Sequence, residues 1–499
     1  MKRYPAACIQ YEPVFGDKET NIDRLSRMIV RAVQRGARLC VLPELATTGY
    51  AMKNASSALP LAEPLTGPTF RAFHRVAEET GCTLLYGFLE REGHVLFNSC
   101  ALVGPGGLAG HYRKTHLFPE EALWLSPGNL PIRTYETPSG RVCPLICMDA
   151  DFFETARVGV IQGAEVLALL TNWVGPSPSK SWRARALENG VWVLASNRCG
   201  EEGGWRFTGG TSIIAPDGSV TASISEGDNI IVSELSAPPT PRYLDGRRPE
   251  LYTEIGLRTY ISSGLLRLPH GRVCTVRALC SPASGIEDAL RRFEEGGERT
   301  DLVVLPVFPA DGASVDWLKE KAAQIAVRFG SVLVAGLNHE ETHVVAALPD
   351  GRIYQYSPVH PAPGERGGKE FVSFDTNFGR VGLLSGLDLY YPEAARCLAK
   401  RGVDIISMSL GALPVEHRYL VADRWASNNT YFVVADVRGE HAGIYGDPEA
   451  GKKHPARVFP TPGDEWVCAS LNTAADWVRR KDYLTRTREE LYYELLKEV

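Results

Sequence analysis

Apolar residues along the chain follow two spacings that alternate from one end to the other. Short runs of consecutive apolar residues, such as 39–42, are typical of buried strands. Longer segments with apolar residues three and four positions apart, such as 20–36, predict amphipathic helices. In the first half we expect strands at 4–11, 39–42, 83–89, 98–103, 166–170, 191–196, 210–215 and 229–235, and helices at 20–36, 70–80, 154–163 and 181–189. This alternation predicts an α/β fold.

The second half of the chain repeats segments of the first half in the same order. RLCVLPEL, which contains Glu44, matches DLVVLPVF, which contains Val307, and RVCPLICMDADFFE matches RVGLLSGLDLYYPE. The offset between matched positions falls from 263 at Glu44 to 239 at Cys147 and then stays near 240. A shrinking offset indicates a divergent duplication in which the second copy lost loops.

The length and composition agree with two domains. The chain has 499 residues, of which 44% are hydrophobic and 23% charged, which is typical of a globular protein with two or three cores. We place the boundary near His270, which gives the domains 1–269 and 270–499. The connecting stretch, 256–268, is apolar enough that we expect it to be packed.

Charge and cysteine usage exclude several classes of partner. The net charge is −5 and like charges form no block, so we expect no nucleic-acid partner. The N-terminus has no apolar signal-peptide core, and no window is long enough to span a membrane, so we expect a cytoplasmic protein without a membrane partner. The odd number of cysteines, 11, fits a reducing compartment, and no CxxC or HExxH pattern indicates a metal. We expect no metal or organic cofactor.

Three reactive side chains stand at the ends of predicted elements in the first copy only. Cys147 follows the apolar run 142–146, but a free cysteine more often packs as a small hydrophobic residue, so its position alone decides little. The second copy is informative here. The positions that match Glu44, Lys114 and Cys147 hold Val307, Pro358 and Gly386, whereas the scaffold pairs His116 and His360, and Asp149 and Asp388, are identical.

The three side chains are sufficient for attack on a C–N bond. A thiolate is a nucleophile, a carboxylate accepts and returns a proton, and an ammonium stabilises the oxyanion that forms on the attacked carbonyl. The backbone N–H of Met148 is a candidate for a second oxyanion donor. Read singly, Glu44 is more often a loop carboxylate and Lys114 a surface cation. Their joint replacement in the second copy favours a shared chemical role.

The segments LCVLPELATTGY, YRKTHLFPEE and PLICMDADFFE resemble the three signature segments of the nitrilase superfamily, the carbon–nitrogen hydrolases. The resemblance implies two tandem four-layer αββα sandwich domains, with Glu44 as general base, Lys114 as oxyanion stabiliser and Cys147 as nucleophile. A second glutamate of the family best matches Glu121, with Glu120 as the alternative. The second domain departs from the pattern at all three catalytic places, which predicts that it is catalytically inactive.

The resemblance also implies how the copies associate. Members of the family pair subunits through the helix after the nucleophile and the helix after the next strand. The corresponding segments here are 152–163 and 181–189 in the first copy and 391–402 and 416–427 in the second. We therefore expect the two copies to form an internal pseudo-dimer. Whether chains associate further into a homo-oligomer is left open by the sequence.

The substrate class is the least defined part of the prediction. We expect a small amide or carbamoyl amide, because the segment around Cys147 is more similar to the amidase branches, where Asp149 rather than glutamate follows two residues after the cysteine. Candidate substrate-binding residues are Tyr50, Phe118, Met148, Asn172 and Trp173, with Trp124 and Arg198 as further candidates. Trp124 and Trp173 are equally well explained as core aromatic residues. Alternatives are nitrile hydrolysis, acyl transfer or glutamine hydrolysis, and a non-enzymatic ligand-binding or regulatory role for the second domain.

Overall fold

The chain folds into two compact units, which we describe one at a time. The computed structural model describes residues 4–238, 243–258, 271–296, 299–446, 457–461, 463–474 and 484–497. Unit 1 contains the described residues up to Asp245 together with Glu490–Leu495, and unit 2 contains those from Gly246 to Glu489 together with the residues after Leu495.

Unit 1 is built from two six-stranded sheets. The first has the order β14-β1-β2-β3-β4-β5, and the second has the order β13-β12-β9-β8-β7-β6. The strands of the first are β1 (Tyr4–Gln10), β2 (Leu39–Val41), β3 (Thr83–Glu92), β4 (Val95–Gly104), β5 (Gly107–Arg113) and β14 (Asn229–Leu235). Those of the second are β6 (Tyr135–Thr137), β7 (Gly140–Ile146), β8 (Val166–Thr171), β9 (Trp192–Asn197), β12 (Ser212–Ile214) and β13 (Val220–Ser223), and a hairpin joins β10 (Cys199–Glu202) to β11 (Trp205–Thr208).

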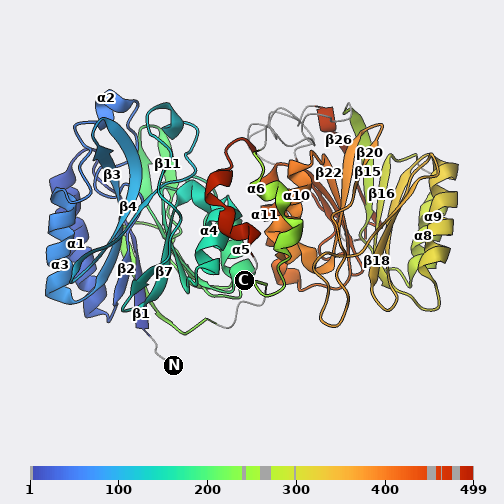
Figure 1. Cartoon of the computed structure of the whole chain (residues 1–499), viewed down its shortest axis with the longest axis horizontal. Helices are drawn as coiled ribbons and strands as arrows, with labels where there is room; N and C mark the ends of the chain where they lie inside the picture. Colours follow the sequence, from blue (N-terminus) through green and yellow to red (C-terminus); the bar gives the residue numbers. More distant parts are fainter. Residues whose placement is uncertain are drawn as a thin grey trace. The chain divides into compact units, whose positions relative to one another are not determined.

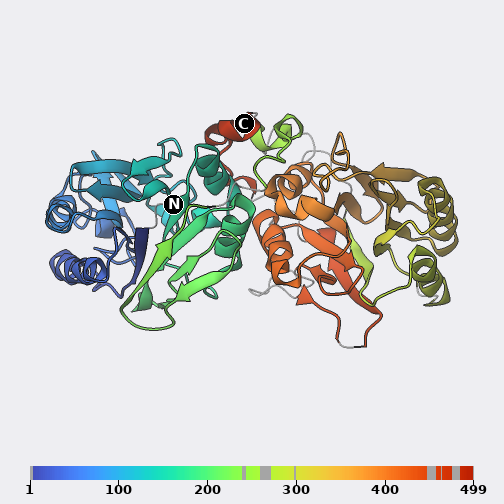
Figure 2. The ribbon, with the colours of Figure 1, turned by 90° about the horizontal axis from the view of Figure 1, so that it is seen from below.

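Helices cover the outer face of each sheet. The helices are α1 (Lys18–Gln34), the short α2 (Ala55–Ala58), α3 (Pro68–Thr80), α4 (Phe153–Ile161) and α5 (Lys180–Asn189). The α1 helix is capped by Asp17, whose carboxylate accepts a hydrogen bond from the Thr20 N–H. Its apolar stripe, which includes Leu25 and Ile29, packs with α3 on the first sheet (Figures 1 and 2).

A second core lies between the two sheets of unit 1. Val41 and Leu85 of the first sheet pack there with Val142, Ile146 and Ala168 of the second. These strands are apolar on both faces, as expected for strands that are buried between a helical layer and another sheet. Unit 1 is therefore a four-layer αββα sandwich, and the predicted fold class is confirmed.

Unit 2 repeats this architecture. Its sheets have the orders β19-β18-β17-β16-β15-β26 and β20-β21-β22-β23-β24-β25. The first contains β15 (Val273–Leu279), β16 (Leu302–Pro309), β17 (Val332–Asn338), β18 (Thr342–Ala347), β19 (Ile353–Tyr356) and β26 (Trp466–Asn472). The second contains β20 (Ser373–Thr376), β21 (Gly379–Ser385), β22 (Ile405–Leu410), β23 (Tyr431–Asp436), β24 (Gly443–Tyr445) and β25 (Arg457–Val458).

The helices of unit 2 also match those of unit 1. They are α8 (Ile286–Gly296) and α9 (Val315–Phe329) on the first sheet, with α10 (Pro392–Lys400) and α11 (Tyr419–Asn428) on the second (Figure 1). Apart from α2 and the β10–β11 hairpin, which have no counterpart in the described part of unit 2, the elements follow the same order in both units, so the predicted duplication is confirmed.

Each copy contributes its last segment to the other unit. The segment that contains α6 (Thr253–Gly256) ends the first copy but belongs to unit 2, whereas Glu490–Leu495, near the end of the second copy, belongs to unit 1. The sequence pattern does not predict this exchange. The predicted boundary near His270, and most of the connecting stretch 256–268, lie outside the described residues.

The predicted helices and long strands agree with the structure to within a few residues. Short strands that pair at sheet edges or in the hairpin, namely β5, β6, β10, β11 and β13, were not predicted. No described helix combines the length and the hydropathy that a membrane span requires.

Candidate active site

Glu44 lies in a tight turn that follows strand β2. Leu45, the next residue, has a left-handed backbone with φ of 46°. The turn packs against Gly87 of β3, where an added Cβ would come within 2.7 Å of the Glu44 Cα atom. Only glycine leaves room for this approach, so β3 fixes the position at which Glu44 leaves the sheet.

Glu44, Lys114 and Glu121 form a buried cluster. The Lys114 ammonium donates to Glu44 Oε1 and to Glu121 Oε2, at 2.7 Å in each case. The Asn98 amide of β4 joins the two carboxylates, since its Nδ2 donates to Glu44 Oε1 at 2.7 Å and to Glu121 Oε1 at 2.9 Å. All four side chains are buried. Such short charge-assisted contacts hold the ammonium in a single position.

Backbone N–H groups also donate to the two carboxylates. The N–H of Asn172 donates to Glu44 Oε2 at 2.8 Å, and the N–H of Phe118 donates to Glu121 Oε2 at 2.8 Å. Of the two glutamates considered from the sequence, the structure therefore brings Glu121 to Lys114, whereas Glu120 is exposed to solvent.

Burial and neighbouring charges shift the titration of this cluster. Burial raises the pKa of Glu44, and although Lys114 lowers it, the Glu121 carboxylate raises it again, so that it lies above the ordinary value of 4.5. Burial alone would lower the pKa of Lys114, but Glu121 and Glu44 raise it well above its ordinary value. The lysine is thus a fixed cation, and Glu44 titrates nearer to neutrality than a free carboxylate.

Cys147 begins the 3₁₀ turn Cys147–Ala150 directly after strand β7. Its backbone φ is +45°, an uncommon value for a residue with a side chain, and the matching Gly386 of unit 2 has φ of +54°. The turn is held by Asp149, whose Oδ2 accepts from the Ile146 N–H at 3.0 Å and from the Tyr112 hydroxyl at 2.7 Å. Cys147 is only 8% exposed.

A histidine and a tyrosine support the carboxylate that holds this turn. Asp149 Oδ1 accepts from the backbone N–H of His116 at 3.0 Å and lies 2.9 Å from His116 Nδ1. The other ring nitrogen, Nε2, lies 2.6 Å from the Tyr492 hydroxyl, and the ring stacks on Phe152 with centroids 3.9 Å apart. Tyr492 belongs to the C-terminal segment that joins unit 1.

The surroundings of the Cys147 thiol raise its pKa. Burial raises its pKa, the Glu44 carboxylate raises it further, and Lys114 lowers it by less. A buried thiol of this kind needs a base that accepts its proton during attack, instead of a preformed thiolate. Glu44 is the carboxylate whose charge acts most strongly on it.

Cys147 opens onto a cavity of about 150 Å³. The predicted residues Tyr50, Phe118, Met148, Asn172 and Trp173 all line this cavity. Asn172 is 5% exposed, and among the residues that the structure describes its carboxamide N and O atoms have no hydrogen-bond partner. A bound polar group could satisfy both atoms, because a carboxamide both donates and accepts.

Two predicted residues lie elsewhere. Trp124 is part of a hydrophobic cluster with Leu45 and Met52 and does not line the cavity, so its interpretation as a core aromatic residue is the one that agrees with the structure. Arg198 forms an ion pair with Glu202 at 3.0 Å and also does not line the cavity.

Several residues of the site are not indicated by the sequence pattern. The cavity is also lined by Asp151, Val174, Gly175 and Trp205, and the cluster contains Asn98. Trp205 comes from strand β11 of the hairpin, which the hydrophobic pattern did not indicate. For Asn98 a signal existed, since a polar amide inside the apolar strand 95–104 requires a buried partner.

The described residues offer no metal site. Within the described ranges, no group of three or more His, Cys, Asp or Glu side chains is arranged to hold a metal ion. The site at Cys147 combines a nucleophile that lines a small cavity with a buried carboxylate, Glu44, and a buried cation, Lys114, whose charges act on the thiol.

Comparisons with known proteins found one matching family model, and relatives and solved structures that are similar to about half of this chain. A family model described as carbon-nitrogen hydrolase matches residues 5–239. A protein named nitrilase from Pyrococcus abyssi is 36% identical over 231 residues, which cover 46% of this chain and 88% of that protein. Omega-amidase NIT2 of Xenopus tropicalis is 30% identical over 253 residues, covering 47% of this chain and 89% of that protein. A solved structure of the amidase from Nesterenkonia sp. AN1 with acrylamide has 26% identity and a TM-score of 0.45, and the match covers 50% of this chain and 95% of that one.

Proposed function

Because the chain belongs to the carbon-nitrogen hydrolase family, we propose that it hydrolyses the C–N bond of a small amide through a thioester on Cys147. The observation that best supports this proposal is the buried contact of Lys114 with Glu44 and Glu121, at 2.7 Å each, next to a cysteine that lines a small cavity. These groups supply a nucleophile, a base and an oxyanion stabiliser at one place.

In the first half-reaction the amide is cleaved. Glu44 takes the proton of the Cys147 thiol while the sulfur bonds to the amide carbon, and the carbonyl oxygen becomes an oxyanion. Lys114 and the N–H of Met148 stabilise this charge. The C–N bond then breaks, Glu44 gives its proton to the leaving nitrogen, and ammonia or an amine departs. The acyl group remains on sulfur as a thioester.

In the second half-reaction water releases the acyl group. Glu44 accepts a proton from the water as its oxygen bonds to the thioester carbon. The C–S bond breaks, Glu44 returns the proton to the sulfur, and the carboxylic acid leaves. Glu121 acts through Lys114: it accepts one of the ammonium's hydrogen bonds and so fixes where the cation points.

The cavity favours a small, neutral substrate. Its volume of about 150 Å³ lies below the roughly 300–1,000 Å³ of pockets for drug-sized ligands. Its described lining includes Asp151 and several aromatic residues but no lysine or arginine. A second carboxylate on the substrate would find no cationic partner in this lining, so we expect neutral aliphatic amides to react faster than monoamides of dicarboxylic acids.

Nitrile hydrolysis is the second candidate. The name of the 36% identical Pyrococcus abyssi relative supports it, and attack of a cysteine on a nitrile carbon would use the same groups. We favour the amide because the residue two positions after Cys147 is Asp149, as in the amidase branches that this segment resembles, and not glutamate. Asp149 holds the turn through hydrogen bonds from Ile146 and His116.

A substrate panel tests the proposal. Purified full-length protein is given neutral amides, carbamoyl amides and nitriles of matched carbon skeleton, and ammonia release is measured. We expect amide turnover that is lost in Cys147→Ala, with an unchanged thermal unfolding temperature. Faster turnover of nitriles than of matched amides would favour the second candidate, and full activity of Cys147→Ala would exclude both.

We also propose that unit 2 has no hydrolase activity. Val307, Pro358 and Gly386 stand at the positions that match Glu44, Lys114 and Cys147, so unit 2 lacks the base, the cation and the nucleophile at these places. Loss of all turnover in Cys147→Ala would support this assignment as well.

A further inference from the structure

Unit 2 contains a cavity at the place where unit 1 has its catalytic cluster. Its volume is about 540 Å³, compared with about 150 Å³ in unit 1. It is lined at the carboxyl ends of strands β16, β21 and β22, and Gly386, the counterpart of Cys147, is part of its wall.

Two sequence differences explain the larger volume. The loop that brings Tyr50 over the cavity of unit 1 has no counterpart of similar length after Val307, because α9 begins at Val315, whereas α3 begins 24 residues after Glu44. Glycine also replaces cysteine at Gly386, where a Cβ would meet nothing within 4 Å. The catalytic side chains are gone, but the space they surrounded has widened.

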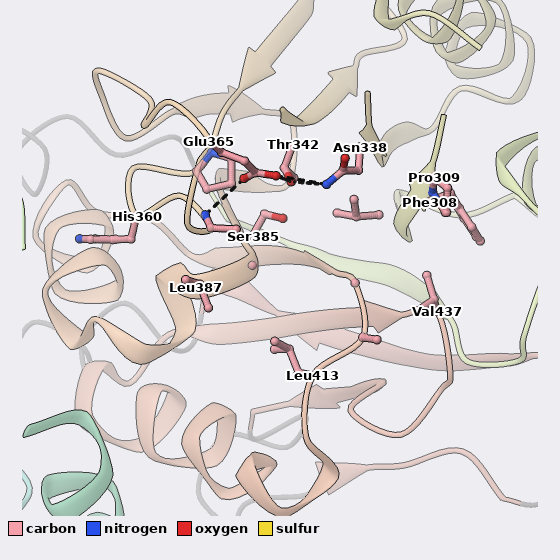
Figure 3. Close-up of a pocket in the computed structure, with 16 residues that line it drawn as sticks. Phe308, Pro309, Asn338, Thr342, His360, Glu365, Ser385, Leu387, Leu413 and Val437 are labelled. Carbon is pink, nitrogen blue, oxygen red and sulfur yellow. Dashed lines mark hydrogen bonds between the residues drawn. The ribbon is translucent and has the colours of Figure 1, made fainter. Parts of the chain in front are cut away.

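One carboxylate of the cluster remains. Glu365 matches Glu121 in sequence, and Thr342 matches Asn98. Glu365 Oε1 accepts from Thr342 Oγ1 and from Asn338 Nδ2, both at 3.2 Å, and its Oε2 accepts from the Ala362 N–H at 3.3 Å. Figure 3 shows Glu365, Thr342 and Asn338 together on one side of the cavity.

The charge of Glu365 has lost its cationic partner. Glu121 receives the Lys114 ammonium at 2.7 Å, but Pro358 stands at the position of the lysine in unit 2. Within the described part of the chain, no lysine, arginine or histidine forms an ion pair with Glu365, and its hydrogen bonds all come from neutral donors. The carboxylate is half-buried in the wall of a cavity and is not neutralised.

The rest of the lining is mainly apolar. Leu387, Leu413 and Val437 lie across the cavity from Glu365 (Figure 3). The His360 ring offers no further acceptor, because Nδ1 lies 2.9 Å from Asp388 and Nε2 lies 2.7 Å from the Tyr252 hydroxyl. The cavity therefore presents one negative group and an apolar surface opposite to it.

We propose that this cavity binds a small primary alkylammonium ion, with the ammonium on Glu365 and the alkyl chain against the apolar side. The ammonium would occupy the place that the lysine holds in unit 1, and would form the charge-assisted bonds that Glu365 lacks. The alkyl chain adds hydrophobic contact with the apolar side, so an alkylammonium ion should bind more tightly than the ammonium ion itself. This site is independent of hydrolysis at Cys147.

Calorimetric titration of the full-length protein with n-butylamine tests the proposal. We expect saturable binding with one site per chain, and much weaker binding of n-butanol, butyrate and ammonium chloride. Replacing the charge in Glu365→Gln should weaken butylamine binding about tenfold or more. Cys147→Ala should bind butylamine as the wild type does, so failure of the proposed hydrolysis would leave this result unchanged.

A second pair of variants tests the location without changing a charge. Gly411 lines the cavity, and a Cβ there would meet nothing within 4 Å, so Gly411→Leu should place an apolar side chain in the cavity and weaken butylamine binding without disturbing the fold. Gly285 is equally open but lies outside the cavity, so Gly285→Leu is the matched control. The proposal would be overturned if the wild type showed no saturable binding of butylamine, or if it bound n-butanol as tightly as butylamine. It would also be overturned if Glu365→Gln or Gly411→Leu bound butylamine as tightly as the wild type does.

Discussion

At the scale of single residues, the site depends on which carboxylates contact one buried lysine. Lys114 donates to both Glu44 and Glu121, and Asn98 donates to the same two carboxylates. A buried ammonium is stable only with such partners, because its transfer from water is costly. Each member of the cluster therefore affects the chemistry of the others.

Glu121→Gln should impair catalysis far more than Glu120→Gln. Loss of the Glu121 charge frees the Lys114 ammonium from one of its two anionic contacts, so the oxyanion donor is less well placed and kcat should fall about 10²-fold. Glu120 is exposed, and its replacement should leave kcat within about twofold. Steady-state kinetics of both variants check this. Equal effects of the two changes would contradict the assignment of Glu121.

The pH dependence of kcat/KM should follow Glu44. The base must be ionised to accept the thiol proton, and its pKa is raised above 4.5, so kcat/KM should fall as the pH decreases through a value above 4.5. The Asn98 hydrogen bond lowers this pKa, so Asn98→Ala should move the acidic limb to higher pH. Thr342→Ala, at the matching position of unit 2, should leave the profile unchanged. A limb that stays in place in Asn98→Ala would argue against Glu44 as the base.

The residues of the site differ in how well the sequence predicted them. Glu44, Lys114 and Cys147 could be recognised because each ends an element and each is replaced in the second copy. Trp205 could not, because it lies in a short hairpin with no clear alternation. For Trp124 the sequence left two interpretations open, since an aromatic residue near a motif is indistinguishable in sequence from one that packs in a core, and the structure agrees with the core interpretation.

At the scale of elements, the turn after β7 is held by a network that both units share. In unit 2, Asp388 accepts from the Ser385 N–H at 3.1 Å and from the Tyr356 hydroxyl at 2.5 Å, as Asp149 does from Ile146 and Tyr112. His360 contacts the Tyr252 hydroxyl just as His116 contacts Tyr492. The scaffold of the turn has thus been retained in a unit that lacks the cysteine.

Tyr492→Phe should lower kcat several-fold while KM changes little. The substitution removes the hydroxyl contact to His116, which supports the Asp149 carboxylate and so the position of Cys147. A lost hydrogen bond of this kind costs about 1 kcal/mol of stability. Tyr252→Phe removes the equivalent contact in unit 2 and should show the stability loss with an unchanged kcat. Thermal unfolding and kinetics of both variants separate the two effects, and a lower kcat in Tyr252→Phe alone would contradict this role for Tyr492.

Periodicity predicted most elements well because long amphipathic helices and buried strands have strong local signals. It did not predict that Glu490–Leu495 joins unit 1 or that the segment around Tyr252 joins unit 2. The local pattern of these segments does not indicate which copy they pack on, because each copy has a matching histidine, His116 or His360, that can contact the tyrosine hydroxyl. Only the three-dimensional structure could assign them.

At the scale of the whole molecule, a duplicated fold is combined with a site that is not duplicated. Both units have the same pair of six-stranded sheets and the same order of helices. The reactive side chains are confined to unit 1, and unit 2 has a wider cavity with one unneutralised carboxylate. Unit 2 has kept the scaffold but lacks the reactive groups. This favours a division of roles in which unit 1 catalyses the reaction and unit 2 binds a ligand. The predicted packing of the two copies as an internal pseudo-dimer stays a prediction.

The central claim is that a thioester on Cys147 carries the reaction, and intact-mass measurement during turnover tests it most directly. Full-length protein is mixed with an amide that it hydrolyses, and the reaction is quenched in acid during the steady state. The intact mass of the protein is then measured, and the protein is digested to locate any added group. The account predicts a mass increase equal to one acyl group, located on the peptide that contains Cys147 and absent in Cys147→Ala. An acyl group on another residue, or turnover by Cys147→Ala at the wild-type rate, would contradict it.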